Sequence, residues 1–149
     1  MCMLAHYYYR GEGGFQQDHA RAMELYARAA DLGFSRAHNQ LGGIYDEGGD
    51  LKKAKFHYEA AAMAGNEETR CIVGCMEAHS GNMERAVKHW TIGASAGCYR
   101  SMHKLRYSFE RGAVSRESID STLAAYNNSC AEMRSKARDA FIRSFIAEG

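Results

Sequence analysis

A period of 32 residues runs through the chain and constrains its fold more than any other feature. Glycine recurs at Gly33, Gly65 and Gly97, and an aromatic side chain recurs at Tyr26, Tyr58 and Trp90. Two alanine series have the same period: Ala22, Ala54, Ala86 and Ala30, Ala62, Ala94. Small residues at one helical position let backbones approach closely, and the aromatic residue fills the space between successive units. The period predicts a solenoid.

The unit from Phe34 to Gly65 contains two segments with apolar residues at helical spacing, separated by Gly48-Gly49-Asp50. Ser35 and Asp50 are expected N-caps, and Gly65 is expected to end the second helix in a left-handed conformation. Applied to the whole chain, this pattern predicts an all-α protein. Helices are expected at about 19–32, 36–47, 51–64, 67–80, 83–96 and 99–111, with Asn66 and Asn82 as further N-caps.

The repeat pattern stops after Gly112, and Ser115 is expected to cap a longer helix. Apolar residues then recur every three or four positions, at Ile119, Leu123, Tyr126, Cys130 and Met133. We expect a terminal cap over 115–147. A second helix starting at Ser135 is preferred over one unbroken helix, because Asn127, Asn128 and Ser129 are poor helix formers.

These residues resemble a known family. Leu41-Gly42 with Tyr45 and Gly48, then Asp50, Lys53-Ala54, Tyr58, Ala61-Ala62 and Gly65, are similar to the Sel-one-like repeat, a relative of the tetratricopeptide repeat. The likeness spans roughly residues 4 to 112. It implies an α/α right-handed superhelix that serves as an adaptor or scaffold, with no catalysis and no cofactor. Glu77 departs from the pattern, since a tyrosine is expected there. The third unit is therefore expected either to pack differently or to match the repeat only loosely.

The expected organisation is a single domain over 1–149. Its repeats are 1–33, 34–65, 66–97 and 98–112, and the last leads into the cap at 115–147. A net charge of +1 gives no general reason to expect nucleic acid or a membrane as partner. No signal peptide or membrane span is apparent. The five cysteines are an odd number outside the repeat register, which favours reduced thiols and a cytoplasmic location.

One spacing has metal-binding potential. Cys71, Cys75 and His79 lie at i, i+4 and i+8 on one face of a helix, with His103 as a possible fourth ligand. A metal-binding or redox module is therefore the alternative to a scaffold. Ligands eight residues apart are separated by about 12 Å along a helix, however, which is too far for one ion. We therefore expect no metal, and interpret these residues as lining a groove.

A second candidate is the basic cluster Arg100, His103, Lys104, Arg106 and Arg111. Its side chains are expected to point around the helix as a solvated face, and no nucleic-acid site is predicted. His57 and His89 occupy equivalent helix positions and are interpreted as packing residues.

The predicted binding surface lies on the first helix of each unit, opposite the face that contains Leu41. The family resemblance implies that first helices line the concave side, where a partner protein or peptide would bind. The expected ladder is Asn39, Gly43, Asp46, Cys71, Cys75, Ala78, His103, Tyr107 and Glu110. Charge changes on the second helices, such as Lys55→Glu, are expected to have no effect on binding.

The first helix begins almost at the repeat motif, without a preceding turn. Met3, Leu4 and Tyr7 are expected to expose apolar surface there. The sequence therefore predicts either self-association through this helix or a chain that is part of a longer array.

Overall fold

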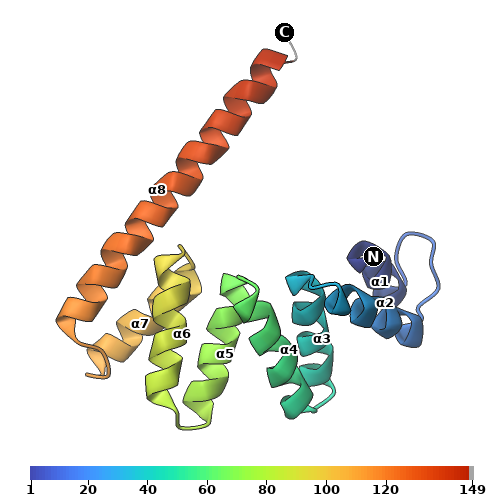
Figure 1. The fold of residues 1–149 in the computed structure, drawn as a ribbon, viewed down its shortest axis with the longest axis horizontal. Helices are drawn as coiled ribbons and strands as arrows, with labels where there is room; N and C mark the ends of the chain where they lie inside the picture. The colour runs from blue at the N-terminus through green and yellow to red at the C-terminus, as the bar shows by residue number, and fades with distance from the viewer. Residues whose placement is uncertain (148–149) are drawn as a thin grey trace.

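The computed structural model describes residues 1–147 and, within them, all side chains except those of residues 141, 142 and 144–147. The described residues form eight α-helices and no strand (Figure 1). The helices are α1 Cys2–Arg10, α2 His19–Asp31, α3 Ser35–Glu47, α4 Leu51–Met63, α5 Glu67–His79, α6 Met83–Ser95, α7 Tyr99–Glu110 and α8 Arg116–Ala147. The predicted all-α repeat fold is confirmed, with helix ends within about one residue of expectation.

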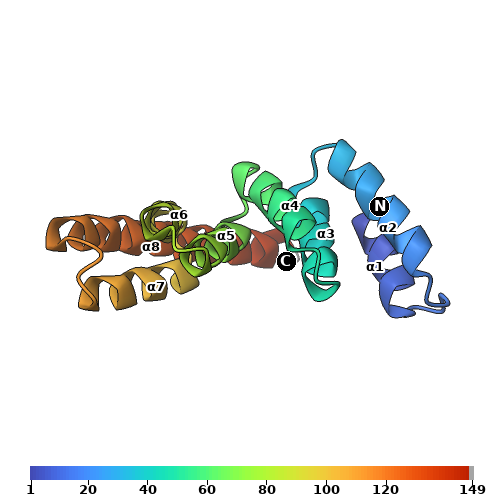
Figure 2. The same ribbon diagram turned by 90° about the horizontal axis from the view of Figure 1, so that it is seen from below.

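The helices stack in chain order, so the hydrophobic core is a linear series of clusters and not one globular core. Each helix packs on its neighbours in sequence, and α8 packs on α6 and α7 (Figures 1 and 2). Each cluster centres on a periodic aromatic residue and continues into the next pair of helices: Tyr26 with Leu41, Tyr58 with Val73, and Trp90 with Leu105. The aromatic residue therefore joins successive pairs, as the repeat pattern predicts.

Side-chain caps begin several helices, as expected, but not all. Oδ1 of Asp50 accepts a hydrogen bond from the backbone N–H of Lys53 at 3.2 Å, and Oδ1 of Asn66 accepts one from Thr69 at 2.9 Å. The expectation for Ser35 is wrong, because α3 begins at Ser35 and its N-cap position is Phe34, which makes no side-chain cap. Asn82 is at the N-cap of α6 without a capping bond, since its amide donates to Glu77 instead.

The expected break in the C-terminal region is also wrong, because α8 is one helix. The start of α8 follows α7 as the second helix of a fourth helix pair. Oγ of Ser115 caps this start by accepting a hydrogen bond from the Ser118 backbone N–H at 3.2 Å. Earlier second helices are followed, two residues beyond their last helical residue, by Gly33, Gly65 and Gly97, whose φ angles are 83°, 92° and 93°. The equivalent position is Ser129, and 113–148 contains neither glycine nor proline. Nothing in the local sequence therefore forces a left-handed stop.

Beyond its packed first half, α8 leaves the array. Ser129 Oγ donates to the Ser95 carbonyl at 2.7 Å, and Met133 contacts the position of Gly97. Residues 131–140 are exposed, and this part of the helix projects from the row of pairs (Figure 1).

Glu77 makes the third unit different from the second. Its side chain is fully buried, and its carboxylate lies 2.8 Å from Lys55 Nζ of α4 and 3.4 Å from Arg85 of α6. The hydrogen bond from Lys55 is the main cause that lowers the pKa of Glu77 below its ordinary value. Lys55 is therefore not a neutral surface position, because Lys55→Glu would place two carboxylates against each other in a buried contact.

Candidate functional site

A groove in the surface of the array follows α5. Three neighbouring pockets, of about 410, 550 and 190 Å³, share the side chain of Cys75 in their walls. We call them together the α5 groove. Helices α3 and α4 form one side of this groove, and α6 and α7 form the other.

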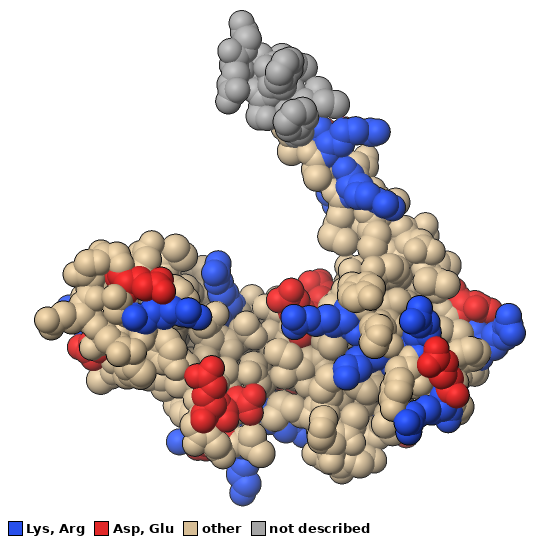
Figure 3. Space-filling model, turned by 180° about the vertical axis from the view of Figure 1, so that it is seen from behind, with Lys and Arg blue, Asp and Glu red and all other residues tan. Residues whose placement is uncertain are grey.

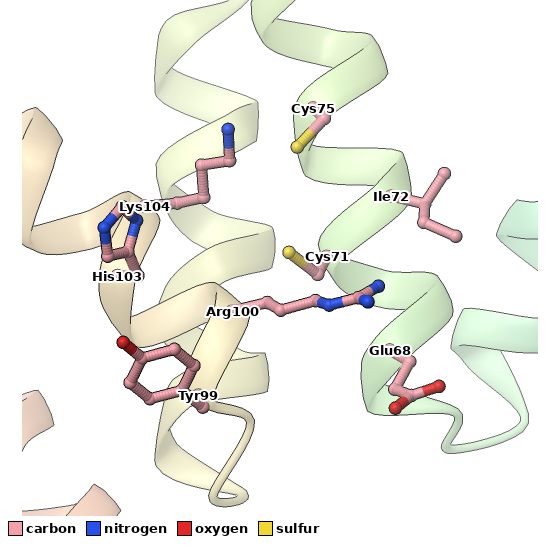
Figure 4. A pocket seen from close by; sticks show the side chains of 8 residues that line it. All are labelled: Glu68, Cys71, Ile72, Cys75, Tyr99, Arg100, His103 and Lys104. Carbon is pink, nitrogen blue, oxygen red and sulfur yellow. The ribbon is translucent and has the colours of Figure 1, made fainter.

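The first pocket lies between α5 and α7 (Figure 4). Its lining residues are Glu68, Cys71, Ile72 and Cys75 from α5, and Tyr99, Arg100, His103 and Lys104 from α7. In Figure 4 the sulfur atoms of both cysteines point from α5 toward the α7 side, whereas Ile72 points to the opposite side of α5. This direction follows from the helix, since residues at i and i+4 share a face.

The other two pockets extend the groove along α5. Asp46, Leu51, Lys52 and Lys55 line the second pocket opposite Ile72, Met76 and His79. The third contains Met83 and Trp90 of α6 and Tyr107 and Arg111 near the end of α7. The Arg111 guanidinium carbon lies 4.7 Å from the centre of the Tyr107 ring. The floor of the groove is thus largely apolar, and its margins are polar.

Positive charge gathers along these margins. Within the described part of the chain, Lys52, Arg100, Lys104 and Arg111 form no ion pair, and the acidic lining residues are Asp46 and Glu68. Lys55 also lines the groove but pairs with Glu77. Elsewhere the two signs are mixed, as Figure 3 shows for one face of the molecule. The groove is therefore more positive than a chain of net charge +1 would suggest.

The two thiols in the groove are electrostatically different. Cys71 is buried and hydrogen-bonds to Cys75, and this bond together with burial raises the pKa of Cys71. The same hydrogen bond is the largest cause that lowers the pKa of Cys75 to about 6, and the nearby Lys104 ammonium lowers it further. The Trp90 indole N–H donates to the Cys71 carbonyl at 3.3 Å, and it also lies near the Cys75 thiol and lowers its pKa.

The structure brings five of the seven sequence-predicted partner-binding residues to the groove: Asp46, Cys71, Cys75, His103 and Tyr107. Cys71 was expected to be exposed on the groove floor, but the structure buries it. Its side chain is only 4% accessible, because α6 and α7 cover it. Asn39 lies outside the three pockets, where its Oδ1 accepts a hydrogen bond from Thr69 at 2.8 Å. Glu110 also lies outside them, 4.0 Å from Arg106.

The sequence did not indicate that the cations Arg100 and Lys104 face the first pocket. The basic cluster was expected to point around α7, but Arg100 and Lys104 line one wall together with His103, which was expected in the groove. Their i, i+3, i+4 spacing was the available signal, since such residues are neighbours on a helix surface. Arg106 is the member of the basic cluster that faces away, toward Glu110.

The metal alternative gains no support from the geometry. His79 Nδ1 lies 2.8 Å from the backbone carbonyl of Cys75, so this imidazole is bound to its own helix. Among the residues that the structure describes, no three His, Cys, Asp or Glu side chains converge closely enough to hold a metal ion.

The stacked helix pairs define an all-α helical-repeat protein. The Sel1 repeat family model matches residues 1–34, 35–66 and 78–98, and the chain belongs to this family. The third match begins just after Glu77, the residue that departs from the pattern. Sel1 repeats generally serve as protein–protein interaction modules and are typically not enzymes.

A solved structure shares the fold. It is the crystal structure of a Sel1 repeat protein from Oxalobacter formigenes, with a TM-score of 0.70 and 21% identity over 89% of this chain. The matched region covers 57% of that protein, so this chain spans little more than half its length. No match was found among curated proteins. None of the helices in the described residues is both long and apolar enough to cross a membrane.

Proposed function

We propose that this protein is a scaffold whose α5 groove binds an acidic segment of a partner protein. The observation that carries the proposal is the set of cations along the groove, Lys52, Arg100, Lys104 and Arg111, which form no ion pair within the described residues. Complementary charge steers association and selects between partners. An acidic segment is the ligand class that such a margin attracts.

The apolar floor supports a peptide ligand with hydrophobic side chains among its acidic ones. Trp90 and Met83 lie in the third pocket, and Ile72 and Met76 lie nearer α4. Tyr107 is half exposed at the edge, with Arg111 stacked over its ring. Tyr, Trp and Arg are the residues most often found as energetic anchors in protein interfaces.

Within this proposal, the residues of the predicted ladder have separate parts. His103 and Tyr107 would contact the ligand from α7, and Asp46 would contact it from α3. Cys71 and Cys75 would form the floor between them. Asn39 and Glu110 would take part only with a partner longer than the groove.

A fluorescence-polarisation titration with synthetic peptides tests this function. The probe is a labelled peptide of Glu, Asp and Leu, compared with a peptide in which Lys replaces each acidic residue. We expect the acidic peptide to bind and the basic one not to bind. The double variant Arg100→Glu/Lys104→Glu should weaken binding by about tenfold or more, which corresponds to about 1.4 kcal/mol.

The matched control is Arg134→Glu/Arg138→Glu on the exposed part of α8, which changes the charge equally at the same i, i+4 spacing. It should leave the affinity nearly unchanged. Equal weakening by both double variants would show that net charge, and not the groove, governs binding. Equal binding of the acidic and basic peptides would contradict the proposed ligand class.

We also infer that the protein self-associates through its N-terminal end. Met1, Met3 and Phe34 are exposed there and border one pocket, and Leu4 is exposed on the same helix as Met3. We call these four residues, Met1, Met3, Leu4 and Phe34, the N-terminal apolar face. A second copy of the chain could cover this face, because neighbouring repeat units bury similar apolar surface against each other.

A further inference from the structure

We propose that Cys75 is a site of reversible S-thiolation by low-molecular-weight disulfides that carry carboxylates. The reagent would enter the first pocket and leave a bulky group attached at the centre of the α5 groove. The proposal deepens the function proposed above, because such an adduct would block the groove. The chemistry itself needs no partner and is tested on the free protein.

The position of Cys75 meets the geometric needs of a reactive thiol. Its side chain is half-buried and borders all three pockets, so it is both accessible and held in place. Figure 4 shows its sulfur pointing toward the α7 side of the first pocket, where Lys104 also lies. No other cysteine of the chain lines more than one of the pockets described here.

The neighbours of Cys75 favour the thiolate, which is the nucleophilic form of cysteine. Cys71 hydrogen-bonds to Cys75, the Trp90 indole N–H lies near it, and the Lys104 ammonium adds positive charge. Cys71 stays protonated because it is buried and donates its hydrogen to Cys75. Cys75 is therefore the thiolate and Cys71 the hydrogen-bond donor, on adjacent turns of α5.

The lowered pKa alone gives only a modest rate advantage. A pKa of about 6 makes most of the Cys75 population thiolate at neutral pH. A less basic thiolate is also a weaker nucleophile, however, so the net gain over an ordinary thiol is only about 2- to 3-fold. Selectivity must therefore come from the surroundings of Cys75.

The surroundings select for anionic reagents. The first pocket, of about 410 Å³, is lined by Cys75 and His103 and by two cations, Arg100 and Lys104. Its lining contains one carboxylate, that of Glu68, so positive charge exceeds negative charge. A cleft lined mainly by one sign of charge concentrates ligands of the opposite sign and raises their encounter rate by about 10-fold or more. A disulfide with carboxylates is attracted there, and one with ammonium groups is repelled.

The reaction is thiol–disulfide exchange and needs no further oxidant. The Cys75 thiolate attacks one sulfur of the reagent R–S–S–R, a new Cys75–S–S–R bond forms, and the reagent S–S bond breaks. The second sulfur leaves as RS⁻ with the bonding electron pair and takes a proton from water according to its own pKa. Cys75 is oxidised, and the leaving sulfur is reduced.

Cys71 does not resolve the adduct into an internal disulfide. Residues at i and i+4 on a helix have Cβ atoms about 5–6 Å apart, whereas a disulfide requires about 3.5–4.5 Å. Closing that bond would distort α5. The adduct therefore persists until an external thiol attacks it, which makes the modification reversible.

The test measures site-resolved reaction rates by mass spectrometry after acid quenching. The two probes are 5,5′-dithiobis(2-nitrobenzoate), which carries two carboxylates, and cystamine, which carries two ammonium groups. For each cysteine, the rate with the anionic probe is divided by the rate with the cationic probe. Comparing this ratio between cysteines of one protein cancels the intrinsic reactivity of the probes.

We expect the anionic-to-cationic ratio at Cys75 to exceed the ratios at Cys98 and Cys130 by about tenfold. Arg100→Gln/Lys104→Gln should remove most of that excess. The matched control Arg134→Gln/Arg138→Gln on exposed α8 should keep it. Circular dichroism of each variant shows that the repeat array is still folded. A Cys75 ratio equal to that of Cys98, or an excess retained in Arg100→Gln/Lys104→Gln, would overturn the proposal.

A second arm separates this inference from the proposed function. The Cys75 adduct, freed of reagent, is titrated with the acidic peptide, and Cys75→Ser treated with the same reagent is the control. We expect the adduct to lower the affinity by about tenfold. The affinity of Cys75→Ser, measured before and after the same treatment, should not change with treatment. If no peptide binds the unmodified protein, the proposed function fails while the thiol selectivity stands. If Cys75 reacts without selectivity, only the present inference fails.

Discussion

Two glycines decide how closely the helices of a pair approach each other. A Cβ atom placed on Gly42 would lie 2.5 Å from Tyr58 Cδ1, and one on Gly74 would lie 2.5 Å from Trp90 Nε1. The glycines and the aromatic residues are each separated by the repeat period. The flat ring of the second helix therefore lies directly on the bare backbone of the first, which explains why the two residue types recur together.

Gly42→Ala should destabilise the protein by about 1–3 kcal/mol, because the new methyl group overpacks the contact with Tyr58. The control is the adjacent Gly43→Ala, whose Cβ would meet only the Tyr58 hydroxyl oxygen at 3.8 Å. That change should be neutral or should stabilise α3 by up to about 1 kcal/mol through helix propensity. Urea unfolding followed by tryptophan fluorescence measures both. The same loss for both variants would show that the ring contact is not the cause.

Two histidines on second helices should make the fold sensitive to mild acid. Burial is the main cause that lowers the pKa of His57 and of His89, and the neighbouring His38 lowers that of His57 further. The Nδ1 atoms of His38 and His57 are 3.0 Å apart, so one ring must donate and the other accept. Protonating both rings would break this contact.

The sign of the pH effect follows from these shifts. A histidine with a lowered folded-state pKa binds fewer protons than the unfolded chain, so its contribution is complete above about pH 6.5 and is lost as pH falls. The urea midpoint should therefore decrease between about pH 7.5 and pH 5.5. The double variant His57→Phe/His89→Phe should show a smaller decrease over the same range. A wild-type midpoint that does not change across this window would contradict the assignment.

At the scale of elements, α8 is one helix with two different environments. Its first half packs on α6 and α7, where Thr122 and Ile119 are buried. Residues 131–140 are exposed, and Met133 at the start of this part still contacts the array at Gly97. We infer that helical continuity beyond Met133 rests on local sequence.

Proline substitutions at two exposed alanines distinguish these halves. Ala124→Pro interrupts the packed half and should lower the free energy of unfolding by about 3 kcal/mol. Ala137→Pro should reduce the helical signal in far-ultraviolet circular dichroism without changing the unfolding midpoint of the array, which Trp90 fluorescence reports. A similar loss of array stability in both variants would mean that the projecting half of α8 contributes to a packed interface.

At the scale of the whole molecule, the row of pairs leaves an apolar surface at one end. In the N-terminal apolar face, Met1, Met3 and Phe34 are each more than half exposed. Contiguous apolar patches of this kind commonly mark interaction sites. The groove follows α5, whereas this face lies at α1 and the start of α3, so partner binding and self-association could occur together.

Sedimentation-velocity measurements over a range of concentrations test the self-association. We expect a monomer–dimer equilibrium that Met3→Glu shifts toward the monomer, because a carboxylate in an apolar interface must be desolvated. The control is Met63→Glu on α4, where Met63 is 80% exposed and lies away from this face. A strict monomer at high concentration, or equal shifts in both variants, would contradict the proposed interface.

Most of the fold could be predicted from the sequence because its signals are local. Helical spacing, glycine stops and polar caps each act within a few residues, and the 32-residue period repeats them along the chain. Ser129 shows the limit of this reasoning. The poor helix formers around it suggested a break, but the missing glycine at this position was the stronger local signal, and α8 continues through it.

The site depended on contacts between distant segments. The sequence placed Cys75 and Tyr107 on helix faces, and the structure places both in the α5 groove. The sequence did not indicate that Cys71 is buried, or that Arg100 and Lys104 lie in the same pocket as the two cysteines. Periodicity fixes the face of a helix on which a residue lies. Whether that face is covered depends on how closely α5, α6 and α7 pack, which side-chain volumes across all three helices decide together.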